Sequence, residues 1–363
     1  MFVKKLQLNN FRNYDREEYN FSPGINIIVG QNAQGKTNCV EAVFLLATGF
    51  SPRVKRDKQV VRYGQKKGEI FAEASSRIGT LSSKIEYYSD ANKKVTVNGI
   101  ETKKVSELLG NIFAIFFNPG ELKLIQESPE DRRRFMDISI SQTSKRYFYA
   151  LSKYKKILEQ RNNLLKDPDK DLIFDTIPIW DEQLANYAAE IIVARNDFIK
   201  RLAPHARAAH SYITDQREDL KVSLSSKYQG SQREIAEELK EGLFATLERD
   251  MILGYTTMGP HRDDLKITVN DEDVRAFGSQ GQQRTAALSL KIAELEIYKE
   301  HFGEAPVLIL DDALSELDKS RQKRLVRLLD GVQTIITCTH VDEEVFEGVE
   351  YKKFVVEEGT IRG

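Results

Sequence analysis

The sequence predicts an α/β fold in which a helical lobe is inserted between two parts of a parallel β-sheet. Three observations support this prediction. An apolar run at 24–29 leads through a glycine-rich loop into a helical pattern, and a second apolar run at 307–310 ends in two aspartates. Between them, apolar residues recur at helical spacing over 146–202. Lys36 in the loop and Asp311 after the second run are 275 positions apart, so the sheet closes only after a long insertion.

Composition is that of a folded protein rather than a disordered or membrane-spanning one. The 363 residues are 40% apolar and 30% charged, which is enough for one large or two medium domains. The two cysteines, Cys39 and Cys338, each fall in a predicted regular element, and no Cys or His cluster has zinc-ligand spacing. The start of the chain lacks a signal-peptide pattern, and no apolar run approaches 18 residues. We therefore expect a cytoplasmic protein that does not contact the membrane.

The first apolar run is a predicted buried strand that opens a phosphate-binding loop. The spacing G-x-x-x-x-G-K-[ST] follows the strand and precedes a helix that stops at Gly49, which is the context this motif requires. Its glycines let backbone N–H groups face phosphate oxygens, and the helix N-terminus adds positive charge. Lys36 is predicted to reach the β- and γ-phosphates of ATP, and Thr37 to hold Mg²⁺. The predicted nucleotide contacts are Gly30, Gln31, Asn32, Ala33, Gln34, Gly35, Lys36 and Thr37.

The second apolar run is a predicted parallel strand whose carboxyl end lies at the same edge of the sheet. Asp311 then suits the Mg²⁺ site, and Asp312 suits orienting or deprotonating an attacking water. A capped strand end with solvated acids is the plainer alternative. A third predicted strand, 334–340, ends at His340, which we interpret as a sensor of the γ-phosphate.

The inserted segment contains a predicted pair of antiparallel helices. Helical spacing runs from Arg146 to Leu165, breaks at 167–171 (DPDKD) and resumes from Asp181 to Leu202. The pair is too short for a long coiled-coil tether. We place a nucleotide-binding lobe at 1–118 with 300–363, and a helical lobe at 119–299.

Basic residues gather in two stretches, although the net charge is only −1. The segment 51–68 contains seven Lys or Arg residues and a single acidic residue, and three consecutive arginines begin at 132. Such runs are often simply solvated faces, but two of them on a neutral chain favour contacts with a DNA backbone. The predicted DNA contacts are Arg53, Lys55, Arg56, Lys58, Arg132, Arg133 and Arg134.

The segment 277–284, FGSQGQQR, precedes a strongly apolar helix. Ser279 occupies the expected N-cap position, and Gly281 leaves room for a ligand to approach the backbone. A hydroxyl, bare backbone and a helix dipole together form an anion site, although a plain helix start would look the same.

Taken with the other motifs, this segment resembles the signature of ABC-type ATPases, which caps the γ-phosphate bound by a second subunit. Ser315–Asp318 resembles the loop that crosses such a dimer interface. The resemblance implies an ABC-type head that dimerises on ATP. It also implies that Ser279, Gly281 and Gln282 contact the partner's nucleotide.

The motifs are more similar still to the RecF family of bacterial recombination mediators. They are LNNFRNY (8–14), GQNAQGKTN (30–38), SPEDRRRFMD (128–137), TTMGPHRDDL (256–265), GSQGQQR (278–284) and LDDALSELD (310–318). The resemblance adds Arg12 and Asn13 to the nucleotide site. It implies a homodimeric ATPase that binds gapped or junction DNA and acts with RecR and RecO to load RecA.

Two departures from the ABC pattern concern catalysis. Asp312 stands where most ABC heads have a glutamate, and Asn118 stands near the place of their loop glutamine. We therefore expect slow hydrolysis, and the resemblance to the RecF family implies that DNA stimulates it. The alternatives are an ABC transporter motor, which the basic stretches fit poorly, and an SMC-like structural head, which the short helical pair fits poorly. An overcoming-lysogenization-type nuclease would need more chain after Asp312.

Overall fold

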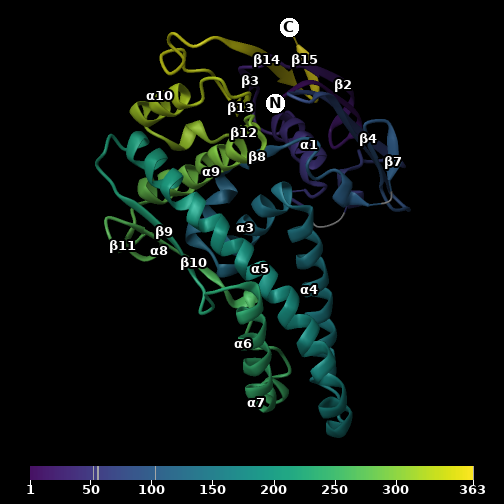
Figure 1. Ribbon diagram of the computed structural model, residues 1–363. Helices are drawn as coiled ribbons and strands as arrows, with labels where there is room; N and C mark the ends of the chain where they lie inside the picture. The colour runs from purple at the N-terminus through teal and green to yellow at the C-terminus, as the bar shows by residue number, and fades with distance from the viewer. Residues whose placement is uncertain (52, 55–56, 103, 363) are drawn as a thin grey trace.

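A parallel sheet forms the centre of the protein, as the sequence predicts. The computed structural model describes residues 1–51, 53–54, 57–102 and 104–362. The sheet has the order β15-β14-β3-β13-β12-β8, and only β15 is antiparallel to its neighbour (Figure 1). Its strands are β3 (Ile25–Val29), β8 (Ala114–Phe117), β12 (Val307–Asp311), β13 (Thr334–Cys338), β14 (Tyr351–Glu357) and β15 (Thr360–Arg362). The loop strand β3 and the acidic strand β12 are separated only by β13, so distant parts of the chain meet here.

A second, antiparallel sheet covers one side of α1 (Lys36–Thr48). Its order is β2-β1-β4-β5-β6-β7. The strands are β1 (Phe2–Phe11), β2 (Tyr14–Asn20), β4 (Lys67–Ser76), β5 (Gly79–Tyr88), β6 (Lys94–Val97) and β7 (Ile100–Thr102). Because α1 packs against both six-stranded sheets, nearly all of its residues are buried, which explains its apolar sequence.

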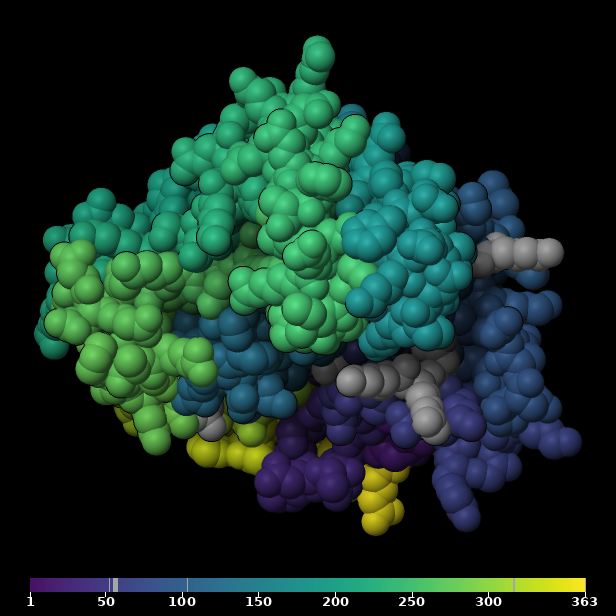
Figure 2. Space-filling view, turned by 90° about the horizontal axis from the view of Figure 1, so that it is seen from below, coloured from purple at the N-terminus to yellow at the C-terminus, as the bar shows by residue number. Residues whose placement is uncertain are grey.

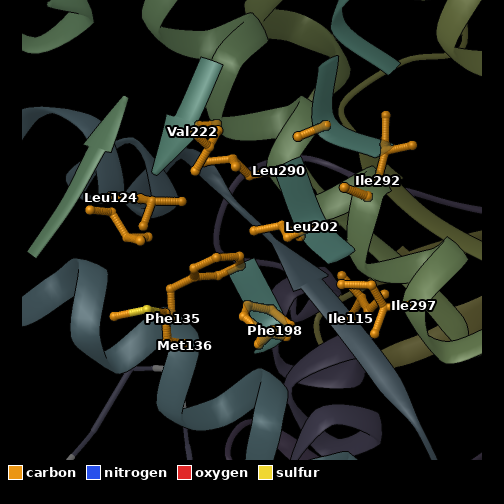
Figure 3. Packing of buried hydrophobic residues seen from close by; sticks show 14 of the residues in the cluster. Ile115, Leu124, Phe135, Met136, Phe198, Leu202, Val222, Leu290, Ile292 and Ile297 are labelled. Carbon is orange, nitrogen blue, oxygen red and sulfur yellow. The ribbon is translucent and has the colours of Figure 1, made fainter. Parts of the chain in front are cut away.

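Helices cover the other face of the parallel sheet. Figure 3 shows their core, a cluster that includes Phe135, Phe198 and Leu290 of the helices and Ile115 of the sheet. The elements here are α2 (Lys123–Gln126), α3 (Pro129–Thr143), α8 (Val274–Phe277), α9 (Gln280–Phe302) and α10 (Lys319–Leu328), with the small sheet of β9 (Leu220–Ser225), β10 (Asp264–Val269) and β11 (Glu272–Asp273). α9 and α5 pack side by side in this core, so the helical lobe shares it with the sheet.

The predicted helical pair is confirmed, but its second helix is much longer than predicted. The pair consists of α4 (Lys145–Leu164) and α5 (Lys170–Ile213), and it projects from the body with α6 (Gln232–Ala245) and α7 (Leu247–Leu253) (Figure 1). The aspartate of DPDKD at 169 is the N-cap of α5, with its side chain accepting from two backbone N–H groups. Ile173 and Ile177 then bury against Leu247, and this packing offsets the helix-breaking effect of Pro178. Within the described ranges, no helix is both long and apolar enough to cross a membrane.

Candidate nucleotide-binding site

The glycine loop between β3 and α1 has the geometry of a phosphate cradle. Gly35 has φ +117°, and a Cβ there would come within 2.8 Å of the Asn13 side chain, so glycine is required. A Cβ on Gly30 would lie 2.4 Å from the carbonyl oxygen of Val356. Lys36 Nζ donates to the carbonyl oxygens of Gly30 (2.6 Å) and Gln31 (2.9 Å), so it lies across the loop. Side-chain caps are absent from the first turn of α1, which leaves backbone N–H groups available to an anion.

Both ends of the chain hold this loop in place. Asn13 Nδ2 donates to the carbonyl oxygen of Gln34 at 3.0 Å, and the N–H of Gly359 donates to the same oxygen at 2.9 Å. Arg12, expected at the nucleotide, instead makes a two-pronged ion pair with the buried carboxylate of Glu41 on α1 (3.0 and 2.7 Å). Asn13 therefore supports the loop and Arg12 supports α1, and a direct contact of either with ATP stays a prediction.

The acidic strand delivers Asp311 directly to the loop. Thr37 Oγ1 donates to Asp311 Oδ1 at 3.0 Å, and Thr337 Oγ1 on β13 donates to the same oxygen at 2.6 Å. Burial raises the pKa of Asp311 above the usual aspartate value, against the opposing effect of these two hydrogen bonds and of Arg53. A hydroxyl and a carboxylate oxygen side by side are the hard ligands that Mg²⁺ prefers alongside phosphates. Thr337 was not identified from the sequence.

Asp312 is held in an unusual backbone conformation. Its φ is +53°, and its N–H donates to Thr337 Oγ1 at 3.0 Å. Ser315 Oγ donates to the carbonyl oxygen of Asp312 at 2.8 Å, which ties the predicted dimer-crossing loop to this residue. A strained residue at a ligand site is consistent with a catalytic role, which for Asp312 stays a prediction. His340 lies two residues beyond the neighbouring strand β13 and is exposed.

A cavity of about 460 Å³ lies on the helical side of Thr37 and Asp311, with Asn118 and Arg53 in its wall. Arg53, predicted as a DNA contact, thus lines this cavity while remaining exposed, and its DNA role stays a prediction. It donates to Asn38 Oδ1 at 2.8 Å and lies 3.5 Å from the carboxylate of Glu41. No sequence signal distinguished Arg53 from its basic neighbours. The loop backbone, Lys36, Thr37 and Asp311 fit a magnesium nucleotide.

The signature segment lies elsewhere on the same chain. Ser279 is the N-cap of α9 and forms a reciprocal capping box with Gln282, as its position predicted. Ser279 is exposed, and none of the described residues that line the 460 Å³ cavity belongs to 277–284. In Figure 1, α8 leads into α9 on the opposite side of the molecule from α1. The loop and the signature of one chain therefore do not form one site.

A single guanidinium connects the signature with the loop that follows Asp312. Arg321 on α10 donates through Nη1 to the carbonyl oxygen of Gly281 at 3.4 Å, and its Nε lies 3.5 Å from Asp318. Glu218, which also accepts from the buried His210 on α5, lies 3.7 Å from Arg321. Arg321 thus fixes two predicted dimer-facing motifs relative to each other.

Two of the predicted DNA contacts, Arg132 and Arg133, need correction or qualification. Arg132 is buried, because both prongs of its guanidinium pair with Asp264 (2.5 and 2.9 Å), so it is a structural residue. Arg133 is half-buried and donates to the carbonyl oxygen of Asp263 at 2.8 Å. Arg134 and Lys58 are exposed, and their DNA role stays a prediction. Lys55 and Arg56 lie outside the described residues.

Comparison with known proteins covers almost the whole chain. The family model "RecF/RecN/SMC N terminal domain" matches residues 2–361. A protein named "DNA replication and repair protein RecF" from Ruminiclostridium cellulolyticum is 43% identical over 94% of this chain and 93% of its own. Its namesake from Clostridium acetobutylicum is 41% identical over 99% of both chains.

Solved structures also resemble this chain over almost its whole length. The recombination mediator protein RecF bound to ATPrS, from the RecFOR pathway, is 36% identical with a TM-score of 0.90, covering 99% of this chain and 97% of that one. An Smc head bound to the C-winged helix domain of ScpA is 16% identical with a TM-score of 0.59, over 100% and 96% of the two chains. The second likeness concerns the fold alone.

Proposed function

The chain belongs to the RecF group of the RecF/RecN/SMC family, and from this premise we propose that it is an ATP-dependent DNA clamp of recombinational repair. In this proposal two copies close on ATP and Mg²⁺ and bind gapped or junction DNA. The closed dimer works with RecR and RecO to load RecA. The RecFOR pathway named for the solved relative supports the partners, and its ATPrS complex supports the nucleotide.

One observation supports the proposal that two copies form a dimer. Thr37 and Asp311 meet within the chain, whereas Ser279 is exposed on another side of the molecule. A complete site of the ABC type therefore needs the signature of a second copy. In such a site Ser279, Gly281 and Gln282 add a hydroxyl and a helix N-terminus to the γ-phosphate.

The residues of the loop and the sheet edge have distinct proposed roles in hydrolysis. Lys36 and the loop N–H groups bind the phosphates, while Thr37 and Asp311 hold Mg²⁺, which neutralises charge on the transferred phosphoryl group. Asp312 orients the attacking water, and His340 senses the γ-phosphate. Asp312 has a shorter side chain than the usual glutamate, which supports slow turnover. We propose in addition that DNA stimulates this turnover.

We also propose that the chain divides into a nucleotide-binding lobe (1–118 with 300–363) and a helical lobe (119–299). The signature helix α9 crosses this boundary, since it ends at Phe302. The segment after β8 contacts α9 through a hydrogen bond from Gln126 Nε2 to Gln283 Oε1 (2.7 Å). Changes around Asn118 at the nucleotide can therefore reach the signature.

The test compares wild type with Lys36→Arg. Light scattering should show a dimer with Mg²⁺ and ATP for the wild type only, since a planar guanidinium cannot reproduce the compact contacts of Lys36 with the loop. DNA binding, measured with a gapped duplex, should be stronger with ATP for the wild type only. A wild type that stays monomeric at saturating ATP, or binds DNA equally with and without it, would overturn the proposal.

A further inference from the structure

A second and larger cavity, of about 670 Å³, lies between the end of α1 and the root of the α4–α5 hairpin. Phe50 lines it from the segment after α1, Arg134 from α3, and Phe148 and Lys155 from α4. In Figure 2 the hairpin helices, in teal, lie next to the purple and blue N-terminal segments. The proposed roles of the nucleotide site do not use this cavity. Its volume is in the range of small-ligand sites.

Several buried polar side chains that line the cavity already have hydrogen-bond or ion-pair partners within the protein. Arg195 is buried and pairs with Asp137 (2.8 Å) and Asp263 (2.9 Å). Tyr154 and His261 share a hydrogen bond of 2.6 Å between Oη and Nδ1, and burial lowers the pKa of His261 to about 4, so the imidazole is neutral at physiological pH. Among the described residues, these buried charged groups are therefore paired with one another and do not require a metal ion or an acidic ligand.

The rim has a different chemistry, combining aromatic rings with cations. The rings of Phe50 and Phe148 lie 6.3 Å apart at 39°, and Phe50 is 49% exposed although it is a large apolar residue. The ammonium of Lys93 lies 5.9 Å from the Phe50 ring, and Arg134 and Lys155 are exposed. Aromatic platforms beside basic side chains are the usual means of binding unpaired nucleotides, because bases stack on the rings while cations hold the phosphates.

Other nucleic-acid ligands fit this chemistry less well. A free nucleoside triphosphate is usually bound at a helix N-terminus or a glycine loop, but the first turn of α3 presents Glu130 to the cavity. Its carboxylate repels the several charges of a polyphosphate more strongly than the single charge of one DNA phosphate. The bases of intact duplex DNA remain in the stack and cannot enter a recess. An unpaired base with a flanking phosphate has both the flat face and the single charges that the rim matches.

We propose that this cavity binds an unpaired nucleotide of DNA, with its base against Phe50 and Phe148 and its flanking phosphates on Arg134 and Lys155. The inference rests on the proposed DNA-binding function and locates its preference for gaps and junctions. Arg134 and Ile138 line both this cavity and the one at Thr37 and Asp311, so a bound nucleotide here contacts the wall of the ATP site.

The test compares binding of a gapped duplex and an intact duplex, both with ATP, for wild type, Phe50→Ala, Phe148→Leu and Phe148→Tyr. Phe50→Ala and Phe148→Leu should reduce affinity for gapped DNA roughly ten-fold, the effect of losing one stacked base. Their affinity for intact duplex should stay within about two-fold of wild type. Phe148→Tyr keeps a ring and should keep the preference. Tyr212→Ala, an exposed aromatic on α5 outside the cavity, is the matched control.

A fluorescent base gives a second readout. 2-Aminopurine at the unpaired position should be quenched by wild type and by Tyr212→Ala, but not by Phe50→Ala. The inference would be overturned if Phe50→Ala and Phe148→Leu both kept the wild-type preference for gapped over intact DNA. It would also be overturned if these variants lost affinity equally for the gapped and the intact duplex. If wild type binds both DNAs equally but only with ATP, the inference fails while the proposed clamp stands. If wild type binds no DNA, the proposed function itself fails.

Discussion

Thr37 Oγ1 lies 3.0 Å from Asp311 Oδ1, although the two residues are 274 positions apart. Thr337 binds the same carboxylate oxygen from the strand between them. The proposed magnesium site is therefore assembled from helix α1 and the two strands β12 and β13, and it exists only when both ends of the chain have folded together. Its core is a buried acid held by two hydroxyls, and this has consequences for stability as well as for catalysis.

Asp311→Asn should stabilise the protein while it abolishes magnesium-dependent ATP binding. Burial raises the pKa of Asp311 in the folded state, so the ionised carboxylate opposes folding at neutral pH. Its favourable contribution is complete only below the unfolded pKa and is lost as pH rises through the folded pKa. Asparagine keeps an Oδ1 that can accept from Thr37 and Thr337. Without nucleotide, the variant should melt at a higher temperature than wild type at pH 7, and the difference should shrink toward about pH 4.

A lower melting temperature for Asp311→Asn at pH 7 would show that the carboxylate is stabilised rather than strained by its surroundings. Thr337→Val is the companion variant. It removes one donor to Asp311 and one of the two acceptors for the N–H of Asp312, so it should destabilise the protein.

Asp312→Asn should separate ATP binding from hydrolysis. Asparagine tolerates the φ of +53° at this position, so the backbone should be preserved. ATP-dependent dimerisation should persist, while steady-state phosphate release should fall roughly a hundred-fold or more, the range expected for a lost general base. An unchanged rate of phosphate release would place the water-orienting group elsewhere.

Arg132 and Arg134 should respond oppositely to alanine substitution, although they are neighbours on α3. Arg132→Ala leaves Asp264 without its partner and should cost about 2–3 kcal/mol of unfolding free energy, less than a fully buried pair because Asp264 is partly exposed. Arg134→Ala should leave stability unchanged but lower the log–log salt slope of DNA binding by about one. Chemical denaturation and binding titrations at several salt concentrations measure the two effects. A stable Arg132→Ala, or an unaltered slope for Arg134→Ala, would contradict this division.

The contrast between Arg132 and Arg134 shows which kind of feature could not be predicted from the sequence. The strand–loop–helix around Lys36 and the acidic strand at Asp311 were predictable, because local spacing and apolar runs specify them. The parallel sheet then followed from the requirement that loop and carboxylate meet. The signature helix was predictable from its N-cap for the same local reason.

Contacts between residues that are far apart in the sequence leave no local sequence signal. Predictions that depended on such contacts were wrong or were not made. Arg132 is buried because Asp264 lies opposite it, 132 residues away, and Arg53 donates to Asn38 Oδ1 beside the glycine loop. Helix α5 continues through Pro178 because tertiary packing at Ile173 and Ile177 outweighs a local breaker. Basic runs in a sequence thus report charge but not which side chains are already paired.

Arg321→Ala should weaken ATP-dependent dimerisation without affecting ATP binding by the monomer. Arg321 contacts both Gly281 and Asp318, so its loss lets the two dimer-facing motifs move independently. The monomer–dimer equilibrium with ATP should shift roughly ten-fold toward monomer. Arg324→Ala is the control, since it removes a cation from the same helix that pairs with Asp215 instead. Equal weakening in both variants would indicate a general loss of α10 packing.

Ser279 can be tested in trans with substitutions that preserve its structural role. Aspartate and asparagine are both good N-caps, so Ser279→Asp and Ser279→Asn should keep the start of α9 intact. Aspartate adds a negative charge that would face the partner's γ-phosphate, whereas asparagine does not. Ser279→Asp should therefore remain monomeric with ATP, as shown by light scattering, while Ser279→Asn should dimerise. Nucleotide binding by the Ser279→Asp monomer should stay near that of wild type, because its own loop is untouched.

Mixing Ser279→Asp with Lys36→Arg then distinguishes action in trans from action in cis. A heterodimer of these chains has one composite site with an intact loop and an intact signature, and a second site that carries both lesions. Phosphate release by the mixture should exceed that of either variant alone, because one complete site is regenerated. If Ser279→Asp instead abolishes ATP binding by the monomer as fully as Lys36→Arg does, the serine acts on its own chain's nucleotide. The exposed position of Ser279, outside the Thr37–Asp311 cavity, favours the first outcome.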